Sequence, residues 1–308
     1  MLRQFPLGRS ADAVTGSPSP ARPAATVMLV RDPVTLSPPG GPGNSTGTVP
    51  GAGTDPAVAG VCGGVEVFVF RRVAGMQFAA GMHVFPGGRV DERDGDPAVA
   101  WHGPGPEEFA AALSADVPLA RALVVAAVRE TFEECGVLLA GTPDGGPVPG
   151  LAAGEWGGVW ADRQRRLSEG RIGLAELLSE AGLVLRAELL RPWAHWVTPP
   201  AEGRRYDTRF FVAGMPPGQQ ARDLGGEGEQ ARWLSAAAAV GQCATGAAPM
   251  LPPTVVCLEE LAAAGSVSAL LAAPRRIRPV MPWVVPGPDG RLLVEVDLDG
   301  SGGGEPRS

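Results

Sequence analysis

The chain has 308 residues, and its 44% apolar content is enough to bury a core in one large or two ordinary domains. Its net charge of −7 argues against a general nucleic-acid binder, which needs a basic surface to displace counterions. A small anionic substrate is compatible with this charge, because a bound metal ion can reverse the local field.

The N-terminal part contains two apolar segments separated by low-complexity sequence. Residues 1–21 are rich in Ser, Pro and Gly, and we expect them to form a disordered tail. Ala24–Val30 predicts a buried strand, and Val65–Arg71 predicts a second strand that is apolar on both faces and therefore central. Residues 37–64 are expected to be a flexible insertion, which lengthens a hairpin loop at little entropic cost if the two strands pair.

The middle of the chain predicts a glycine turn and two helices. Gly81–Val90 is expected to be a short strand that runs into a Pro-Gly-Gly turn, and Glu107–Leu113 predicts one or two helical turns. Asp116 is a capping acid, followed two residues later by a proline in the first turn, where a missing N–H is harmless. We therefore expect a helix from this point to Cys135, ended by Gly136.

The second half of the chain continues to alternate helices and strands. Two amphipathic helices are expected within 155–182, and two more begin near Thr254 and Ser266. Three strand-like runs lie between these helices: Trp193–Val197, Arg209–Ala213 and Gln230–Leu234. This alternation, with hairpin-like strand neighbours, predicts an α/β fold with a mixed sheet flanked by helices.

The helix expected before Gly136 carries an apolar stripe and a separate acidic patch. At about 100° per residue, the stripe consists of Val124, Val125, Val128, Phe132 and Cys135. Glu130, Glu133 and Glu134 fall together on the other side. Three crowded carboxylates repel one another unless a cation neutralises them, and oxygen-only ligands at this spacing suit Mg²⁺ or Mn²⁺ rather than zinc.

The same pattern also fits an ordinary solvated helix face, in which Arg129 and Glu133 form an i,i+4 surface ion pair. The surrounding sequence favours the metal-binding interpretation. Upstream, Phe85-Pro86-Gly87-Gly88 ends a strand in a turn whose glycines let the backbone approach a ligand closely. Downstream, the sequence RETFEECGV runs from Arg129 to Val137.

Together these two halves resemble the signature of the Nudix hydrolase superfamily, which is Gly, five residues, Glu, seven residues, then Arg-Glu-apolar-x-Glu-Glu-x-Gly-apolar. This chain differs at three points. Asp94 stands where the signature has its first Glu, and 34 residues rather than seven separate Asp94 from Arg129. Thr131 occupies a usually apolar position. A box split in this way resembles the branch that contains the nineteenth mammalian Nudix protein and coenzyme A diphosphatases.

The resemblance implies a Nudix α/β/α sandwich with a mixed sheet over residues 22–275. Residues 95–117 would be an insertion in the Nudix box, and 155–182 would be extra helices. Residues 276–308 would follow a helical C-terminal region as a partly disordered extension. The insertion leaves open whether Asp94 lies near the acidic helix.

The resemblance also implies roles for individual residues. Glu130, Glu133 and Glu134 would hold Mg²⁺ or Mn²⁺, with Glu133 also the candidate base, and Arg129 would orient the carboxylates. Glu227 is a candidate further catalytic carboxylate, for which Glu229 is an alternative. Three residues are candidates for substrate binding: Gly87 and Gly88 through the turn, and Arg209 through a substrate phosphate.

The implied reaction is attack of water on the phosphoanhydride of a nucleoside-diphosphate-linked substrate. The branch favours coenzyme A or an acyl derivative, while a nucleotide sugar, a dinucleotide or an oxidised nucleoside triphosphate stays open. The alternative function is a Nudix-fold module that binds a nucleotide, or regulates through it, without cleaving it.

Localisation and partners are predicted more coarsely. Four dispersed cysteines without a CxxC pair indicate reduced thiols rather than a disulfide framework or a zinc site. No run of 18 apolar residues occurs. We therefore expect a soluble cytoplasmic protein that acts on a small molecule, without a membrane or a nucleic-acid polymer as partner. A homodimer stays open.

Overall fold

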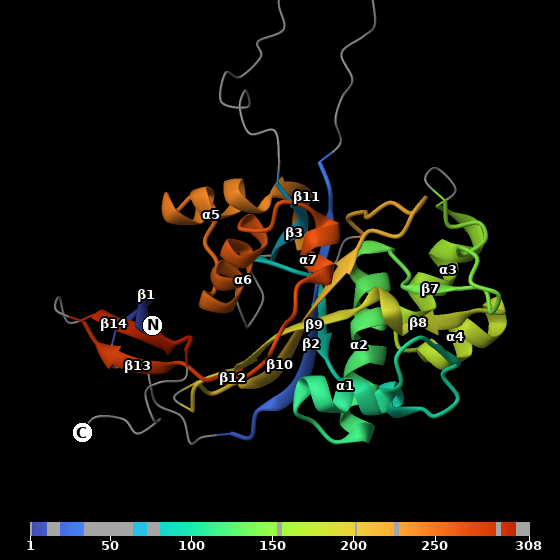
Figure 1. The fold of residues 1–308 in the computed structure, drawn as a ribbon, viewed down its shortest axis with the longest axis horizontal. Coiled ribbons are helices and arrows are strands. Elements are labelled where there is room, and N and C mark those ends of the chain that lie inside the picture. The colour runs from blue at the N-terminus through green and yellow to red at the C-terminus, as the bar shows by residue number, and fades with distance from the viewer. Residues whose placement is uncertain are drawn as a thin grey trace, which may run out of the picture.

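A mixed β-sheet lies at the centre of the molecule (Figure 1). The computed structural model describes residues 2–10, 19–33, 64–72, 81–152, 156–200, 202–224, 228–287 and 291–299. Within these ranges the main path of the sheet has the order β11 (Gly228–Ser235), β3 (Glu66–Arg72), β2 (Arg22–Arg31), β10 (Tyr206–Gly214), β9 (Arg191–Val197) and β12 (Pro279–Val280). Two short strands extend it: β4 (His83–Val84) pairs with β3, and β5 (Gly87–Arg89) pairs with β2.

The pairing pattern confirms both the mixed sheet and the expected hairpin. Strand β10 runs parallel to β2, and β12 runs parallel to β9. Strand β9 pairs antiparallel with β10, and β3 and β5 pair antiparallel with β2. Strands β2 and β3 pair through Val30 and Val67. The flexible insertion expected at 37–64 lies, except for Gly64, outside the described residues.

Helices cover both faces of the sheet, which explains why β2 is apolar on both sides. Ala25, Val27 and Leu29 face a core shared with α1 (Pro106–Leu113) and α2 (Val117–Cys135). Met28 and Val30 face a second core, which is closed by three helices: α5 (Ala236–Ala244), α6 (Pro252–Ala262) and α7 (Val267–Ala272). The expected α/β/α sandwich is therefore confirmed, and α6 and α7 are the two helices predicted near residues 254 and 266.

A smaller unit packs beside α2, on the right in Figure 1. The two helices expected within 155–182 are α3 (Gly158–Ser168) and α4 (Leu174–Ala181). Short strands join them to the box insertion, because β8 (Val184–Arg186) pairs with both β6 (Trp101–His102) and β7 (Ala140–Gly141). Two 3-10 turns, Glu92–Gly95 and Ala187–Leu189, complete this region. The insertion in the box and the extra helices thus form one unit.

The prediction that residues 1–21 form a disordered tail is wrong for residues 2–10. Residues 2–10 form β1 (Leu2–Ser10), which pairs antiparallel with β14 (Arg291–Asp297), and β14 also pairs with β13 (Trp283–Pro286). Side chains add to this sheet, since Arg3 Nη2 donates to Glu259 Oε1 of α6 at 2.9 Å. The order of β1 depends on pairing with β14, more than 280 residues further along the chain, and the local composition of β1 cannot reveal such a partner.

The described helices were also compared with the length and hydropathy of a membrane span. None of them alone is long and apolar enough to cross a membrane. Helices α1 and α2 reach the required length and composition only as a pair, and this pair is bent by 96°.

Candidate active site

Helix α2 begins and ends where its sequence predicts. The Asp116 carboxylate accepts the backbone N–H of Leu119 at 2.8 Å, which caps the first turn. At the other end, Gly136 adopts φ 69° and its N–H reaches the carbonyl of Phe132 at 3.0 Å. Thr131, the departure from the apolar signature position, is fully buried and its hydroxyl donates to the carbonyl of Ala127 at 2.7 Å. The helix is thereby fixed at both ends, with its acidic residues in the last two turns.

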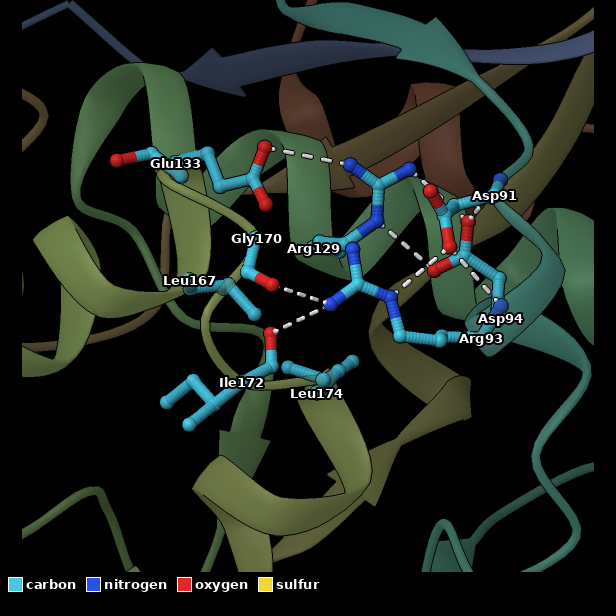
Figure 2. Close-up of a pocket in the computed structure, with 11 residues that line it drawn as sticks. Asp91, Arg93, Asp94, Arg129, Glu133, Leu167, Gly170, Ile172 and Leu174 are labelled. Atoms are coloured by element: carbon cyan, nitrogen blue, oxygen red, sulfur yellow. Dashed lines mark hydrogen bonds and ion pairs between the residues drawn. The ribbon is translucent and has the colours of Figure 1, made fainter.

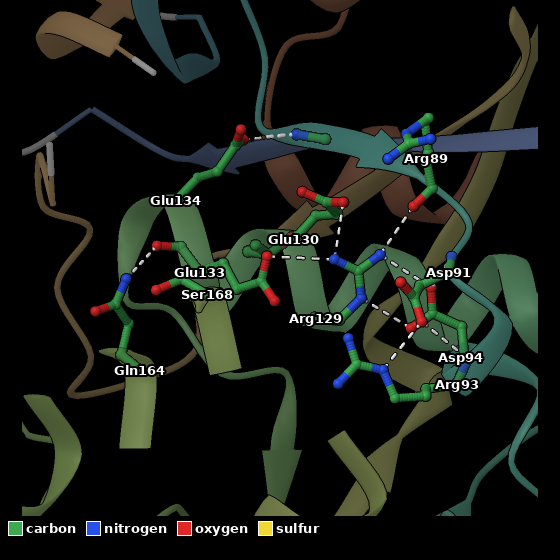
Figure 3. A network of polar contacts seen from close by, with 12 residues as sticks. Arg89, Asp91, Arg93, Asp94, Arg129, Glu130, Glu133, Glu134, Gln164 and Ser168 are labelled. Carbon is green, nitrogen blue, oxygen red and sulfur yellow. Dashed lines mark hydrogen bonds and ion pairs between the residues drawn. The ribbon is translucent and has the colours of Figure 1, made fainter. Parts of the chain in front are cut away.

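Arg129 is the centre of the polar network on this helix (Figure 3). Its guanidinium donates hydrogen bonds to both carboxylate oxygens of Asp94, from Nε to Oδ1 at 2.8 Å and from Nη2 to Oδ2 at 2.9 Å. Nη1 donates to Glu130 at 2.9 Å and to Glu133 at 3.2 Å. A further bond joins Nη2 to the carbonyl of Arg89 at 2.9 Å. One arginine therefore connects the acidic helix to the strand and turn that precede the insertion.

Asp94 lies in this network despite the long insertion that follows it. Its side chain is 1% exposed, and its Oδ2 also accepts the backbone N–H of Asp91 at 2.7 Å, which closes the capping box of the Glu92–Gly95 turn. The insertion leaves this turn and returns to α2, so the box is split in sequence but joined in space. The spacing of six residues after Gly88 was the sequence signal for this position.

The glycine turn contacts Glu134 and lies close to Glu130. The N–H of Gly87 donates to Glu134 Oε2 at 2.8 Å. A Cβ atom on Gly88 would lie 2.3 Å from Glu130 Oε1, and one on Gly87 would lie 2.4 Å from the carbonyl oxygen of Ala25. Gly88 leaves room for Glu130 because strand β5 passes directly over the acidic face of α2, whereas Gly87 leaves room for the backbone of the neighbouring strand β2.

The electrostatics of the cluster reflect its burial. Burial disfavours the charged form of Arg129, but the bonds to Asp94 and the charges of Glu130, Asp94 and Glu133 outweigh it and raise the pKa of Arg129. Burial, opposed by Arg129 and reinforced by the negative charges of Glu130 and Asp94, raises the pKa of Glu133 to about 7. The cluster thus carries more negative charge than its single guanidinium neutralises.

A cavity of about 130 Å³ opens beside this network (Figure 2). Asp94, Arg129 and Glu133 lie on one side of the cavity, and the turn between α3 and α4 lies on the other. Arg93 bridges the two sides, since its Nη1 donates to the carbonyl of Gly170 at 2.7 Å. The cavity therefore gives small molecules or water access to Glu133.

The ability of the cluster to hold a metal ion depends on the type of its donor atoms and on how closely they converge. Within the described ranges, no three acidic, histidine or cysteine side chains converge closely enough to hold a metal ion as they stand. Their chemistry nevertheless fits one, because the carboxylates of Asp94, Glu130 and Glu133 surround one guanidinium in a partly buried site, and Glu134 lies one turn beyond Glu130 on the same helix. Hard oxygen donors of this kind suit Mg²⁺ or Mn²⁺.

Arg209, which was predicted to bind a substrate phosphate, lies buried in the central sheet. It lies in β10, is 3% exposed, and bonds through Nε to the carbonyl of Leu113 at 3.3 Å and through Nη1 to Asp207. This burial leaves the guanidinium little surface for a substrate phosphate, and the substrate-binding role of Arg209 stays a prediction. Glu227 and the side chain of Glu229 lie outside the described residues.

Two residues that contact the cluster or its helix were not predicted from the sequence. Arg93 is one, and Gln164 is the other, because its Nε2 donates to the backbone carbonyl of Glu133 at 2.6 Å. Neither belongs to the signature. Both depend on the packing of the α3–α4 unit, for which the sequence carries no local signal.

Known proteins are similar to this chain in sequence and in fold. Residues 104–261, just over half of the chain, match the family model of the NUDT19 Nudix domain. Acyl-coenzyme A diphosphatase NUDT19 of Gallus gallus is 32% identical over 196 residues, and that of Homo sapiens is 30% identical over 197 residues. These alignments cover 51% and 53% of this chain and 50% and 51% of the relatives, so the chain spans about half the length of the curated relatives it matches.

A solved structure extends the comparison to most of the fold. The crystal structure of a Nudix hydrolase from Alicyclobacillus acidocaldarius has a TM-score of 0.63 and 28% sequence identity, and the match covers 83% of this chain and 97% of that one. The family match, this shared fold and the signature joined around Arg129 lead to one conclusion. The chain belongs to the Nudix hydrolases, in the family of the NUDT19 Nudix domain.

Proposed function

We propose that this protein is a Mg²⁺- or Mn²⁺-dependent hydrolase that cleaves the phosphoanhydride bond of coenzyme A or an acyl-coenzyme A. The observation that carries the proposal is the joined box, in which Asp94 and Arg129 bring the turn at Gly87 and Gly88 against the glutamates of α2. The printed names of the chicken and human relatives, acyl-coenzyme A diphosphatase, support the choice of substrate.

Each residue of the cluster has a distinct task in this proposal. Glu130, Glu133 and Glu134 would hold the metal, which when bound neutralises the diphosphate and lowers the pKa of water. Glu133 borders the cavity and takes the proton of the attacking water, whose oxygen forms a bond to phosphorus as the bridging P–O bond breaks. Arg129 keeps the Glu130 and Glu133 carboxylates in place, and the Gly87 N–H orients Glu134.

The test is a turnover assay with candidate diphosphates in the presence of Mg²⁺ or Mn²⁺. Coenzyme A, an acyl-coenzyme A, a nucleotide sugar and a dinucleotide polyphosphate are compared, and product masses identify the bond that breaks. With coenzyme A we expect 3′,5′-ADP and 4′-phosphopantetheine, and ¹⁸O-water shows which of the two phosphates was attacked. A chelator is expected to stop the reaction.

Site variants connect this activity to the cluster. Glu133→Gln and Glu134→Gln are expected to lower kcat by about 100-fold or more, because each removes a carboxylate from the site. Glu176→Gln, an exposed glutamate on α4, serves as the matched control and retains full activity. Unchanged turnover in both site variants would contradict the assignment.

The alternative function, a Nudix-fold module that binds without cleaving, predicts a different result. Such a module binds the nucleotide in calorimetry but releases no product with either metal. The presence of all three glutamates, held by Arg129 and the glycine turn, favours the hydrolase.

A further inference from the structure

Helix α3 contacts α2, and its side chains touch two consecutive residues in the last turns of that helix. The Trp160 ring packs on the Phe132 ring with centroids 6.0 Å apart and an interplanar angle of 82°. One turn further along the same face of α3, Gln164 Nε2 donates to the backbone carbonyl of Glu133 at 2.6 Å (Figure 3). The acceptor is a carbonyl, so the amide nitrogen and not its oxygen faces Glu133.

The bond from Gln164 supplies a partner that the helix itself lacks. The last four carbonyls of an α-helix have no intrahelical donor. In α2, the N–H of Gly136 reaches Phe132, and the N–H of Arg222 reaches the carbonyl of Cys135 at 3.0 Å. The carbonyl of Glu133 is reached by the side chain of Gln164. Three separate parts of the chain therefore fix the end of the acidic helix.

The position of this carbonyl makes the bond matter for the site. It belongs to the peptide group that links Glu133 to Glu134, so one bond orients the backbone between two of the three glutamates. Helix α3 is itself anchored in the core, because Trp160 and Leu167 on its inner face are buried. A fixed donor on a fixed helix can hold this peptide in one orientation.

We propose that Gln164 is a positioning residue, which sets the Glu133–Glu134 peptide and thereby the two carboxylates for metal binding and hydrolysis. The inference rests on the proposed function. Gln164 touches neither the substrate nor the reacting atoms, and it acts through the backbone of α2. Residues that support metal ligands in this way typically change metal affinity or activity by 10–100-fold when they are replaced.

The experiment compares Gln164→Met with a matched control, Gln219→Met. The side-chain amide of Gln219 also bonds the backbone just after α2. Its Nε2 donates to the Leu138 carbonyl and its Oε1 accepts the Leu138 N–H, both at 2.9 Å. Its partner bears no carboxylate, so its loss is structural only. Gln164→Glu is a second variant, which keeps the shape of the side chain but loses the N–H donor.

Three measurements separate positioning from stability: Mn²⁺ affinity by calorimetry without substrate, kcat and KM for coenzyme A, and Tm. We expect both Gln164 variants to weaken Mn²⁺ binding by about 10-fold and to lower kcat by about 10-fold at nearly constant KM. Gln219→Met is expected to lower Tm about as much as the Gln164 variants do, but to leave metal affinity and kcat unchanged.

Two outcomes overturn different claims. If the Gln164 variants bind Mn²⁺ and turn over like Gln219→Met, the positioning role is wrong while the proposed function stands. If the wild-type protein neither binds Mn²⁺ nor hydrolyses any of the diphosphates, the proposed function is wrong and the positioning role with it.

Discussion

Arg129 bonds two carboxylates and a backbone carbonyl besides the buried Asp94, and its own side chain is only 13% exposed. Replacing one partner of a buried pair is more harmful than replacing both, because the remaining charge stays buried without compensation. At the residue scale this asymmetry identifies the Asp94–Arg129 pair as the joint that holds the split box together.

The first prediction concerns this pair. Arg129→Gln is expected to lower the free energy of unfolding by about 3 kcal/mol, because it leaves the Asp94 carboxylate buried and unpaired. Adding Asp94→Asn to this variant is expected to recover part of the loss, since the buried charge is then removed. Urea unfolding of both single variants and of the double variant measures the coupling. Strictly additive losses would show that the pair is not coupled.

Asp207 supports a prediction on pH. Burial acts to raise the pKa of Asp207, but bonds from His195 and Arg209 outweigh it and hold the pKa at about 2, below its ordinary value of 3.8. A carboxylate whose pKa is lowered by folding stabilises the protein above the unfolded pKa and loses this contribution as pH falls through the folded value. The stabilisation is therefore complete above about pH 4 and is lost between about pH 4 and pH 2.

The corresponding variant is Asp207→Asn. We expect it to lower the free energy of unfolding at pH 7 by on the order of 1–2 kcal/mol, a figure reduced because the side chain is 27% exposed. The difference from wild type should shrink toward pH 2. Urea midpoints at pH 7, 4 and 2.5 test this. Asp162→Asn, which breaks an exposed pair with Arg165, is the control and should change stability very little.

At the scale of elements, the approach of β5 to α2 gives a sharp prediction. Gly88→Ala places a methyl group 2.3 Å from Glu130 Oε1, so the carboxylate or the strand has to move. Because displacements of about 1 Å in a site can lower rates by about 100-fold, we expect a loss of that size in kcat/KM. Gly95→Ala, whose added Cβ has open space, is the matched control in the same region. Equal activity of the two variants would contradict the close approach.

The elements that could be predicted from sequence are those with local signals. Helix α2 has a capping acid and a terminal glycine, and strands β2 and β3 have long apolar runs. Strands β1, β13 and β14 were not predicted, because their order depends on pairing between distant segments rather than on a local pattern. Strands β6, β7 and β8 are only two or three residues long, too short for any periodicity.

The candidate site divides in the same way. The three glutamates and Arg129 could be identified because helical spacing and the signature place them together. Asp94 could not be placed, since no rule of chain geometry tells whether the 34 residues between Asp94 and Arg129 bring these two residues together. The burial of Arg209 beside Asp207 could not be predicted either, because it depends on packing between β10 and distant elements.

At the scale of the whole molecule, the three-stranded sheet of β1, β14 and β13 lies on the side away from α2 (Figure 1). Deleting residues 2–10 is expected to lower Tm, because β14 loses one of its two neighbours and α6 loses the Arg3–Glu259 pair. The exposed strand edge should also promote association, which light scattering detects. The kcat of the molecules that stay folded is expected to be unchanged. A large loss of kcat at unchanged Tm would contradict this separation.

The pairing of Leu2 with Asp297 also has a consequence for biosynthesis. A ribosome adds about 5–20 residues per second, so roughly 15–60 seconds pass between the appearance of the first strand and that of its partner. During this interval the backbone groups of β1 bond to water, while α2 and the strands beneath it are already available to fold. The acidic helix and its glycine turn can therefore assemble on the nascent chain before β1 pairs with β14.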